Sequence, residues 1–234
     1  MSNLLKIATN HFMDLFNKSW KYSKKSYSQE GEDLVLDSIL HEKKNGFYID
    51  IGAHHPFRFS NTYFFYKKGW RGINIDATPG SMNLFKKHRP RDINLEIPIS
   101  NDNKKINYFI FNEPALNSFS KKLSKERNIN TTYKIEKVIK LAPKRLAEVL
   151  DKYLPQNINI DFMSIDVEGY EYQVLTSSNW NKYQPNYILI ELLRVDFDRV
   201  IRNKIYKFLK NKNYKFIAFT GRTAIFKLDF DKRA

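Results

Sequence analysis

Acidic side chains stand at or just after the ends of several short apolar segments in this 234-residue chain. Side chains of this type can accept hydrogen bonds from a ligand's hydroxyl groups, take up a proton or hold a cation. Carboxylates gathered at one edge of a fold repel one another unless a ligand or cation relieves the crowding. The acidic residues at these positions are Asp50, Asp76, Asp166, Glu168 and Glu191, and Gly52 follows closely after Asp50.

Apolar runs typical of strands alternate with segments of helical periodicity, and this alternation sets the expected fold. We predict strands at 47–52, 72–76, 93–100, 158–166 and 186–193, an added pair at 105–111 and 133–141, and a closing pair at 214–220 and 223–228. Helices are expected near 34–40, 143–150, 171–175 and 200–209. Alternation of this kind predicts an α/β fold: a mainly parallel sheet with helices on both faces and one antiparallel edge strand.

In such a sheet, ligands bind beyond the carboxyl ends of the strands, where the loops converge. Gly52 allows a ligand to approach the backbone closely. Asp76 follows it by about twenty residues, the spacing at which an acidic side chain accepts hydrogen bonds from ribose hydroxyls. The loop lacks the G-x-G-x-x-G pattern, because Ala53 and His54 follow Gly52, and the chain has no P-loop motif. A typical dinucleotide-binding loop and a P-loop ATPase are therefore disfavoured.

Four motifs occur in order along the chain, three of them at the expected ends of strands. They are SQEGED at 28–33, YIDIGAHHP at 48–56 with SNT at 60–62, IDATP at 75–79 and SIDVEGYE at 164–171. Together they resemble the FkbM family of S-adenosylmethionine-dependent methyltransferases, over about residues 27–193. Each motif is weak alone, and the specificity comes from their combination.

The resemblance implies a class I methyltransferase (Rossmann-like) fold with a seven-stranded sheet, and S-adenosylmethionine as cofactor. By position, it assigns the methionine part of the cofactor to Asp50, Gly52 and Ala53, the ribose to Asp76 with the adjacent Ala77, and the adenine neighbourhood to Ser100 and Asn101. Three further residues are expected to close over the cofactor: Gln29, Glu32 and Asn61.

Methyl transfer to a hydroxyl needs two oriented reactants and a group that removes the proton. The candidates for this base are Asp166, Glu168 and His55, with Glu191 as a more distant one. Other roles stay open: His54 and His55 could hydrogen-bond the loop backbone, and Glu168 could interact with a helix N-terminus. A third possibility is a Mg or Mn ion held by His55, Asp166 and Glu168.

FkbM-like enzymes methylate oxygen in varied acceptors, so the expected acceptor is a sugar hydroxyl of a nucleotide-activated sugar or of a bacterial surface glycan. Arg58, Glu191 and Arg222 are the candidate acceptor contacts. The alternative is a non-catalytic basic module that binds RNA or an anionic membrane, since the formal net charge is +15. The basic residues are scattered rather than arranged in stripes, so no nucleic-acid partner is expected.

The sequence also predicts the organisation of the chain. Residues 1–26 are expected to form an amphipathic helix, residues 27–234 the methyltransferase domain, and the polar segment 112–132 a loop or lid. The chain has no cysteine, which excludes thiol catalysis and thiolate metal sites. No apolar run reaches the ~20 residues of a membrane-spanning helix, so a cytoplasmic protein is expected. A homodimer is left open.

Overall fold

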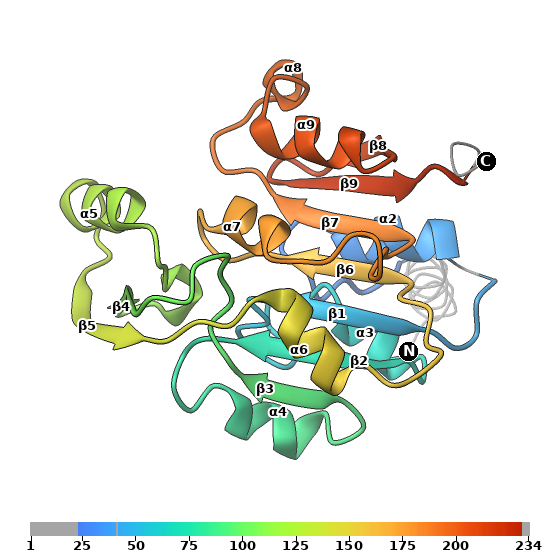
Figure 1. Cartoon of the computed structure of the whole chain (residues 1–234), viewed down its shortest axis with the longest axis horizontal. Helices are drawn as coiled ribbons and strands as arrows, with labels where there is room; N and C mark the ends of the chain where they lie inside the picture. The colour runs from blue at the N-terminus through green and yellow to red at the C-terminus, as the bar shows by residue number, and fades with distance from the viewer. Residues whose placement is uncertain (1–22, 41, 231–234) are drawn as a thin grey trace, which may run out of the picture.

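The computed structural model describes residues 23–40 and 42–230 (Figure 1). The helix expected in 1–26 lies almost wholly outside the described residues. Within those ranges, no helix combines the length and the apolar character needed to cross a membrane.

A seven-stranded sheet forms the centre of the structure and confirms the predicted fold class. Its order is β3 (Ile93–Glu96), β2 (Arg71–Asp76), β1 (Phe47–Ile51), β6 (Phe162–Ile165), β7 (Tyr187–Glu191), β9 (Thr223–Leu228) and β8 (Tyr214–Phe219). The strands from β3 to β7 are parallel, and β9 runs antiparallel to both of its neighbours at one end of the sheet. Strand order reverses beside β1, which lies between β2 and β6. This arrangement places a crevice beyond the carboxyl ends of β1 and β6.

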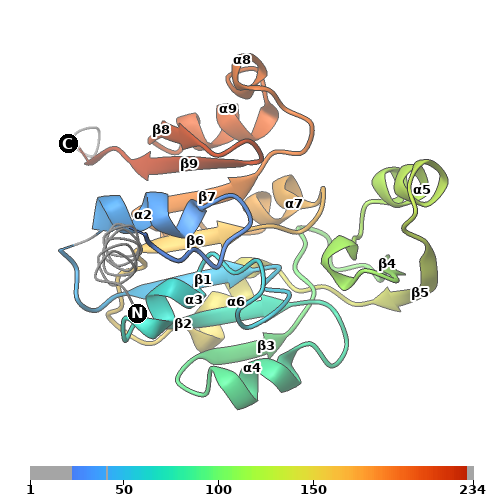
Figure 2. The ribbon, with the colours of Figure 1, turned by 180° about the vertical axis from the view of Figure 1, so that it is seen from behind.

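Side chains of β1 alternate between two apolar layers, which explains why all five of its residues are buried. Ile49 packs in the layer covered by α6 (Leu146–Tyr153), α7 (Glu171–Thr176), α8 (Phe197–Val200) and α9 (Lys204–Asn211). Tyr48 packs in the opposite layer, covered by α2 (Glu32–Leu40) and α3 (Tyr63–Lys67). Figures 1 and 2 show these two sets of helices from opposite sides. Helix α4 (Met82–His88) contributes Phe85 to a small apolar cluster with Ala53.

Several expected elements differ in extent from the structure; the strand expected at 158–166, for example, spans only Phe162–Ile165. The strand expected at 93–100 ends at Glu96, before Pro98, which has no N–H to donate to a neighbouring strand. The single helix expected near 200–209 is two helices, because the Asn203 side chain accepts a hydrogen bond from Ile205 N at 2.8 Å and caps the start of α9.

The segment 112–132, expected to be a loop or lid, contains the short helix η1 (Pro114–Leu116) and the ten-residue helix α5 (Lys121–Asn130). It connects β4 (Ile106–Phe111) to β5 (Ile135–Leu141), which form a separate antiparallel pair beside the main sheet (Figure 1). Ser120 caps α5 by accepting from Leu123 N. α5 carries little apolar surface, so its hydrophobic periodicity could not reveal it.

A fully buried charged network lies beneath the loop that follows β1. Arg89 Nε lies 2.8 Å from Asp92 Oδ2, and both side chains are completely inaccessible to solvent. Arg89 also donates to Tyr48 Oη at 2.7 Å and to Thr62 Oγ1 at 2.9 Å. Thr62 Oγ1 in turn donates to Asp50 Oδ2 at 2.7 Å. This network ties α4 to β1 and to the loop that carries Asn61.

Candidate active site

The loops after β1 and β6 touch at Gly52, which has φ of +82°. A Cβ built at this position would lie 1.6 Å from the backbone oxygen of Asp166, so no other residue fits without moving one of the two loops. Gly52 thus allows Asp166 to reach the crevice between the strands.

A pocket with an empty volume of about 500 Å³ opens beside Gly52. Asp76 lines it from the end of β2, and its carboxylate accepts from His54 N at 2.9 Å and from Thr78 N at 2.7 Å. These two amides fix the carboxylate at the pocket wall, and each oxygen keeps a lone pair for a ligand hydroxyl. Ala77 also lines the pocket, together with the apolar side chains Ile51, Ile75, Ile97, Ile99, Val167 and Phe119. A carboxylate beside apolar walls fits the ribose and adenine of S-adenosylmethionine.

Part of this pocket wall comes from β4 and η1, which the sequence analysis did not assign to the site. Tyr108 Oη lies 2.8 Å from Thr78 Oγ1, and Asn117 Nδ2 donates to the same oxygen at 3.3 Å. The segment 112–132, which was expected to be a loop or lid, therefore forms part of the pocket wall.

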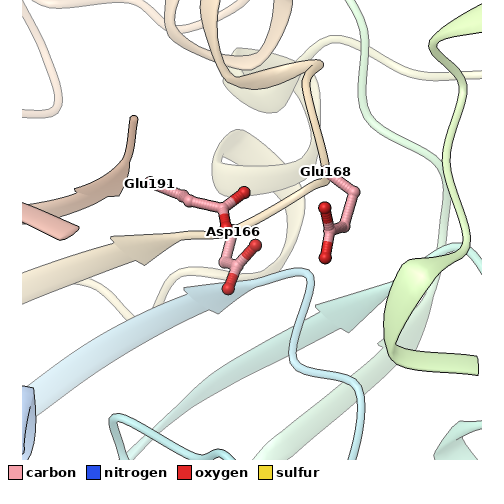
Figure 3. A group of neighbouring side chains, drawn as sticks. All are labelled: Asp166, Glu168 and Glu191. Carbon is pink, nitrogen blue, oxygen red and sulfur yellow. The ribbon is translucent and has the colours of Figure 1, made fainter. Parts of the chain in front are cut away.

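Three carboxylates converge at the inner edge of the pocket: Asp166, Glu168 and Glu191 (Figure 3). One oxygen of each lies within 4.8 Å of the others. Burial, followed by the charge of Glu168, raises the pKa of Asp166 well above its usual value. Burial, followed by the charge of Asp166, does the same to the pKa of Glu191. Glu191 Oε2 is buried and has no hydrogen-bond partner among the described residues.

Arg127, on α5, forms an ion pair with Glu168 that the sequence analysis missed. Burial raises the pKa of Glu168 and the Arg127 guanidinium opposes this shift. The backbone oxygen of Glu168 accepts from Ser118 Oγ at 2.7 Å, so Glu168 is held by both its backbone and its side chain. At the start of α7 it is Glu171, not Glu168, whose side chain accepts from backbone amides, those of Val167 and Gly169 in the preceding loop. Arg127 is the only arginine in 112–132, and its difference from the surrounding lysines was the one available signal.

A second, smaller pocket lies on the other side of Asp166. Asn61 lines it and donates to Ser164 Oγ at 3.1 Å, and Glu32 accepts from Thr220 Oγ1 at 2.9 Å. Among the residues that the structure describes, Asp166 alone lines both pockets. The complete lining is Gln29, Glu30, Glu32, Phe59, Asn61, Asp166, Glu191, Arg222 and Thr223.

The sequence profile of the methyltransferase FkbM domain matches residues 50–216, more than two thirds of the chain. The chain belongs to the FkbM methyltransferase family.

Comparison with curated proteins found no match. The solved structures that are similar include the following two methyltransferases. A TehB-like SAM-dependent methyltransferase from Corynebacterium glutamicum is 9% identical, with a TM-score of 0.43 and coverage of 96% of this chain and 100% of that one. A precorrin-6y C5,15-methyltransferase from Geobacter metallireducens is 14% identical, with a TM-score of 0.40 and coverage of 87% and 91%.

In this FkbM methyltransferase, the His55 side chain does not belong to the cluster of Asp166, Glu168 and Glu191. Its Nδ1 accepts from Phe57 N at 3.3 Å and from Arg58 N at 3.1 Å, which is the loop-holding role left open by the sequence. In the described part of the chain, the group that could hold a cation is Asp166, Glu168 and Glu191, so Glu191 takes the place expected for His55.

Four residues with expected cofactor contacts line neither pocket: Asp50, Ala53, Ser100 and Asn101. Asp50 is buried beneath it, where burial raises its pKa and Thr62 is its hydrogen-bond partner. Ala53 packs against α4. Ser100 is buried, and Asn101 donates to Thr176 Oγ1 at 2.8 Å on the surface.

Two predicted acceptor contacts are arginines with carboxylate partners. Arg58 makes a two-point contact with Glu113, at 3.1 and 3.0 Å, and does not line either pocket. Arg222 lines the second pocket and lies 3.2 Å from Glu30.

Proposed function

We propose that this FkbM methyltransferase transfers a methyl group from S-adenosylmethionine to a sugar hydroxyl of a nucleotide-activated sugar or a bacterial surface glycan. The observation that carries the proposal is the position of Asp166 between the two pockets. The first pocket would hold the cofactor through Asp76 and Ala77, and the second would hold the acceptor.

S-adenosylmethionine, when bound, supplies a methyl group on a sulfonium that an acceptor oxygen displaces in line. Asp166 would accept the proton of the acceptor hydroxyl, because it is the acidic group common to both pockets. Its raised pKa makes it a stronger base than an exposed carboxylate. Arg127 would keep Glu168 ionised beside it. Gln29, Glu32 and Asn61 would contact the acceptor side of the site, rather than the cofactor.

A Mg or Mn ion remains a prediction, with Asp166, Glu168 and Glu191 as the residues that would hold it. The fit is supported by the oxygen donor set and by the unpartnered Oε2 of Glu191. An ion there would contribute positive charge close to the acceptor hydroxyl.

Transfer of radiolabelled methyl from S-adenosylmethionine to a panel of UDP-, GDP- and dTDP-sugars and surface oligosaccharides tests the proposal. We expect labelling of at least one sugar. If no sugar is labelled and the protein instead binds RNA with steep salt dependence, the alternative of a basic binding module is correct.

Replacing Asp76 by alanine is expected to weaken S-adenosylhomocysteine binding by about 30-fold or more, because hydrogen bonds from the ribose to a charged group are lost. Calorimetric titration measures this directly. Asp198→Ala, an exposed acidic residue on α8, is the control of equal charge change. Equal affinity in the two variants would exclude Asp76 from the cofactor site.

A further inference from the structure

Aromatic side chains line an open groove of about 950 Å³ near the second pocket. They are Tyr27, Phe57, Phe59 and Tyr63, and Phe57 and Phe59 are 38% and 45% exposed. Tyr63 links two of the other rings, since its ring centroid lies 4.8 Å from that of Tyr27 and 5.6 Å from that of Phe57. The Phe59 ring packs against the Arg58 guanidinium, 4.4 Å from the ring centroid. Exposed rings held by neighbouring rings form a platform on which a planar ligand can stack.

Phe59 borders both this groove and the second pocket. Its φ is +57°, a left-handed conformation that is a genuine outlier for a bulky residue. Strain of this kind concentrates at ligand sites. A ligand that occupies the groove can therefore extend past Phe59 toward Asp166.

Lys25 lines the groove, and Lys67 lies beside it at the ring of Tyr27. Lys25 Nζ and Lys67 Nζ lie 5.2 and 5.3 Å from the ring centroid of Tyr27, and Lys67 also donates to Tyr27 Oη at 2.9 Å. Within the described ranges, neither lysine has a carboxylate within ion-pair distance. Two like charges held at one ring favour an anionic ligand between or beside them.

The second pocket has the opposite character. Glu30, Glu32, Asp166 and Glu191 line it, and burial together with Glu32 raises the pKa of Glu30 to about 7. Its one lining cation, Arg222, is paired with Glu30. The pocket therefore offers no unpaired cation to a phosphate, whereas its carboxyl groups can accept hydrogen bonds from the hydroxyls of a neutral sugar.

We propose that the groove binds the nucleoside diphosphate portion of the acceptor. The base stacks on the exposed rings of Phe57 and Phe59, and the diphosphate lies near Lys25 and Lys67. The sugar then extends past Phe59 into the carboxylate-lined pocket. This inference rests on the proposed function and selects a nucleotide-activated sugar over a free glycan.

Calorimetric titration of the full chain with UDP, GDP and dTDP separately tests this inference, with uridine and inorganic pyrophosphate as partial ligands. We expect at least one nucleoside diphosphate to bind, and uridine and pyrophosphate to bind at least about tenfold more weakly. Lys67→Met and Phe57→Leu should each weaken nucleoside diphosphate binding about tenfold. Lys137→Met, an exposed lysine on β5, is the matched control and should leave binding unchanged.

S-adenosylhomocysteine is titrated into the same samples. If it binds and no nucleoside diphosphate does, the groove assignment is overturned while the proposed function stands. If neither binds, the proposed function itself is overturned. Unchanged nucleotide binding in both groove variants, or tighter binding of an RNA oligonucleotide or of a nucleotide-free oligosaccharide to the groove, also overturns the assignment.

Discussion

Replacing Asp166 by asparagine should lower kcat by about 10²–10⁴-fold, the usual contribution of a positioned general base. Asparagine preserves the shape of the side chain but cannot accept the acceptor's proton. Asp166 N donates to Ile51 O at 2.9 Å, and this backbone contact does not depend on the side chain. The variant should therefore fold and bind S-adenosylhomocysteine with similar affinity. The measurement is kcat on a nucleotide sugar that the unaltered protein methylates.

The pH dependence of the methyltransferase activity provides an independent test of Asp166 as the base. Burial raises the pKa of Asp166, so the carboxyl group is protonated, and inactive as a base, up to a higher pH than an exposed aspartate. Activity of the unaltered protein should rise with pH through this raised pKa, and the rise should vanish in Asp166→Asn. Glu168→Gln removes the negative charge that, after burial, contributes most to the raised pKa of Asp166, so the rise should move to lower pH. Asp166→Asn activity within tenfold of the unaltered protein would rule out Asp166 as the base.

The parallel sheet and half of the candidate site could be predicted because both depend on local pattern. Apolar runs identify buried strands, and the residue that ends each strand lies at the same edge as the others. Gly52, Asp76 and Asp166 are found there for this reason. The place of Glu191 beside Asp166 depends on β7 pairing directly with β6, which the sequence does not encode locally.

The rest of the site depends on tertiary contacts. Arg127 reaches Glu168 only because α5 belongs to the segment from β4 to β5, which is inserted in the chain between β3 and α6. His55 was predicted to face Asp166, but the loop after β1 turns at His54, with φ of +52°, and directs the imidazole of His55 toward its own backbone. The pattern of residue types gives no information on such turns. The neighbours of the proposed base, Asp166, are therefore harder to predict than Asp166 itself.

Replacing Arg89 by alanine should reduce the free energy of unfolding by about 3–5 kcal/mol, because it leaves a buried charge without its partner. Asp92 would keep only neutral donors: Tyr48 Oη at 2.8 Å, Gly72 N at 2.9 Å and Asn74 Nδ2 at 2.9 Å. Urea denaturation measures the loss. Lys87→Ala, at an exposed position in the last turn of α4 just before Arg89, should change stability by less than about 0.5 kcal/mol.

The same substitution should weaken the site through the loop that Arg89 supports. Its guanidinium donates to Pro56 O and to Ser60 Oγ, both at 3.4 Å, and to Thr62 Oγ1. These hydrogen bonds hold the loop between His55 and α3 at three positions. That loop carries Phe59 and Asn61. Amide hydrogen exchange in 55–62 should therefore increase in Arg89→Ala more than in Lys87→Ala. A stability loss below about 1 kcal/mol, or unchanged exchange in the loop, would show that water or neighbouring hydroxyls replace the guanidinium.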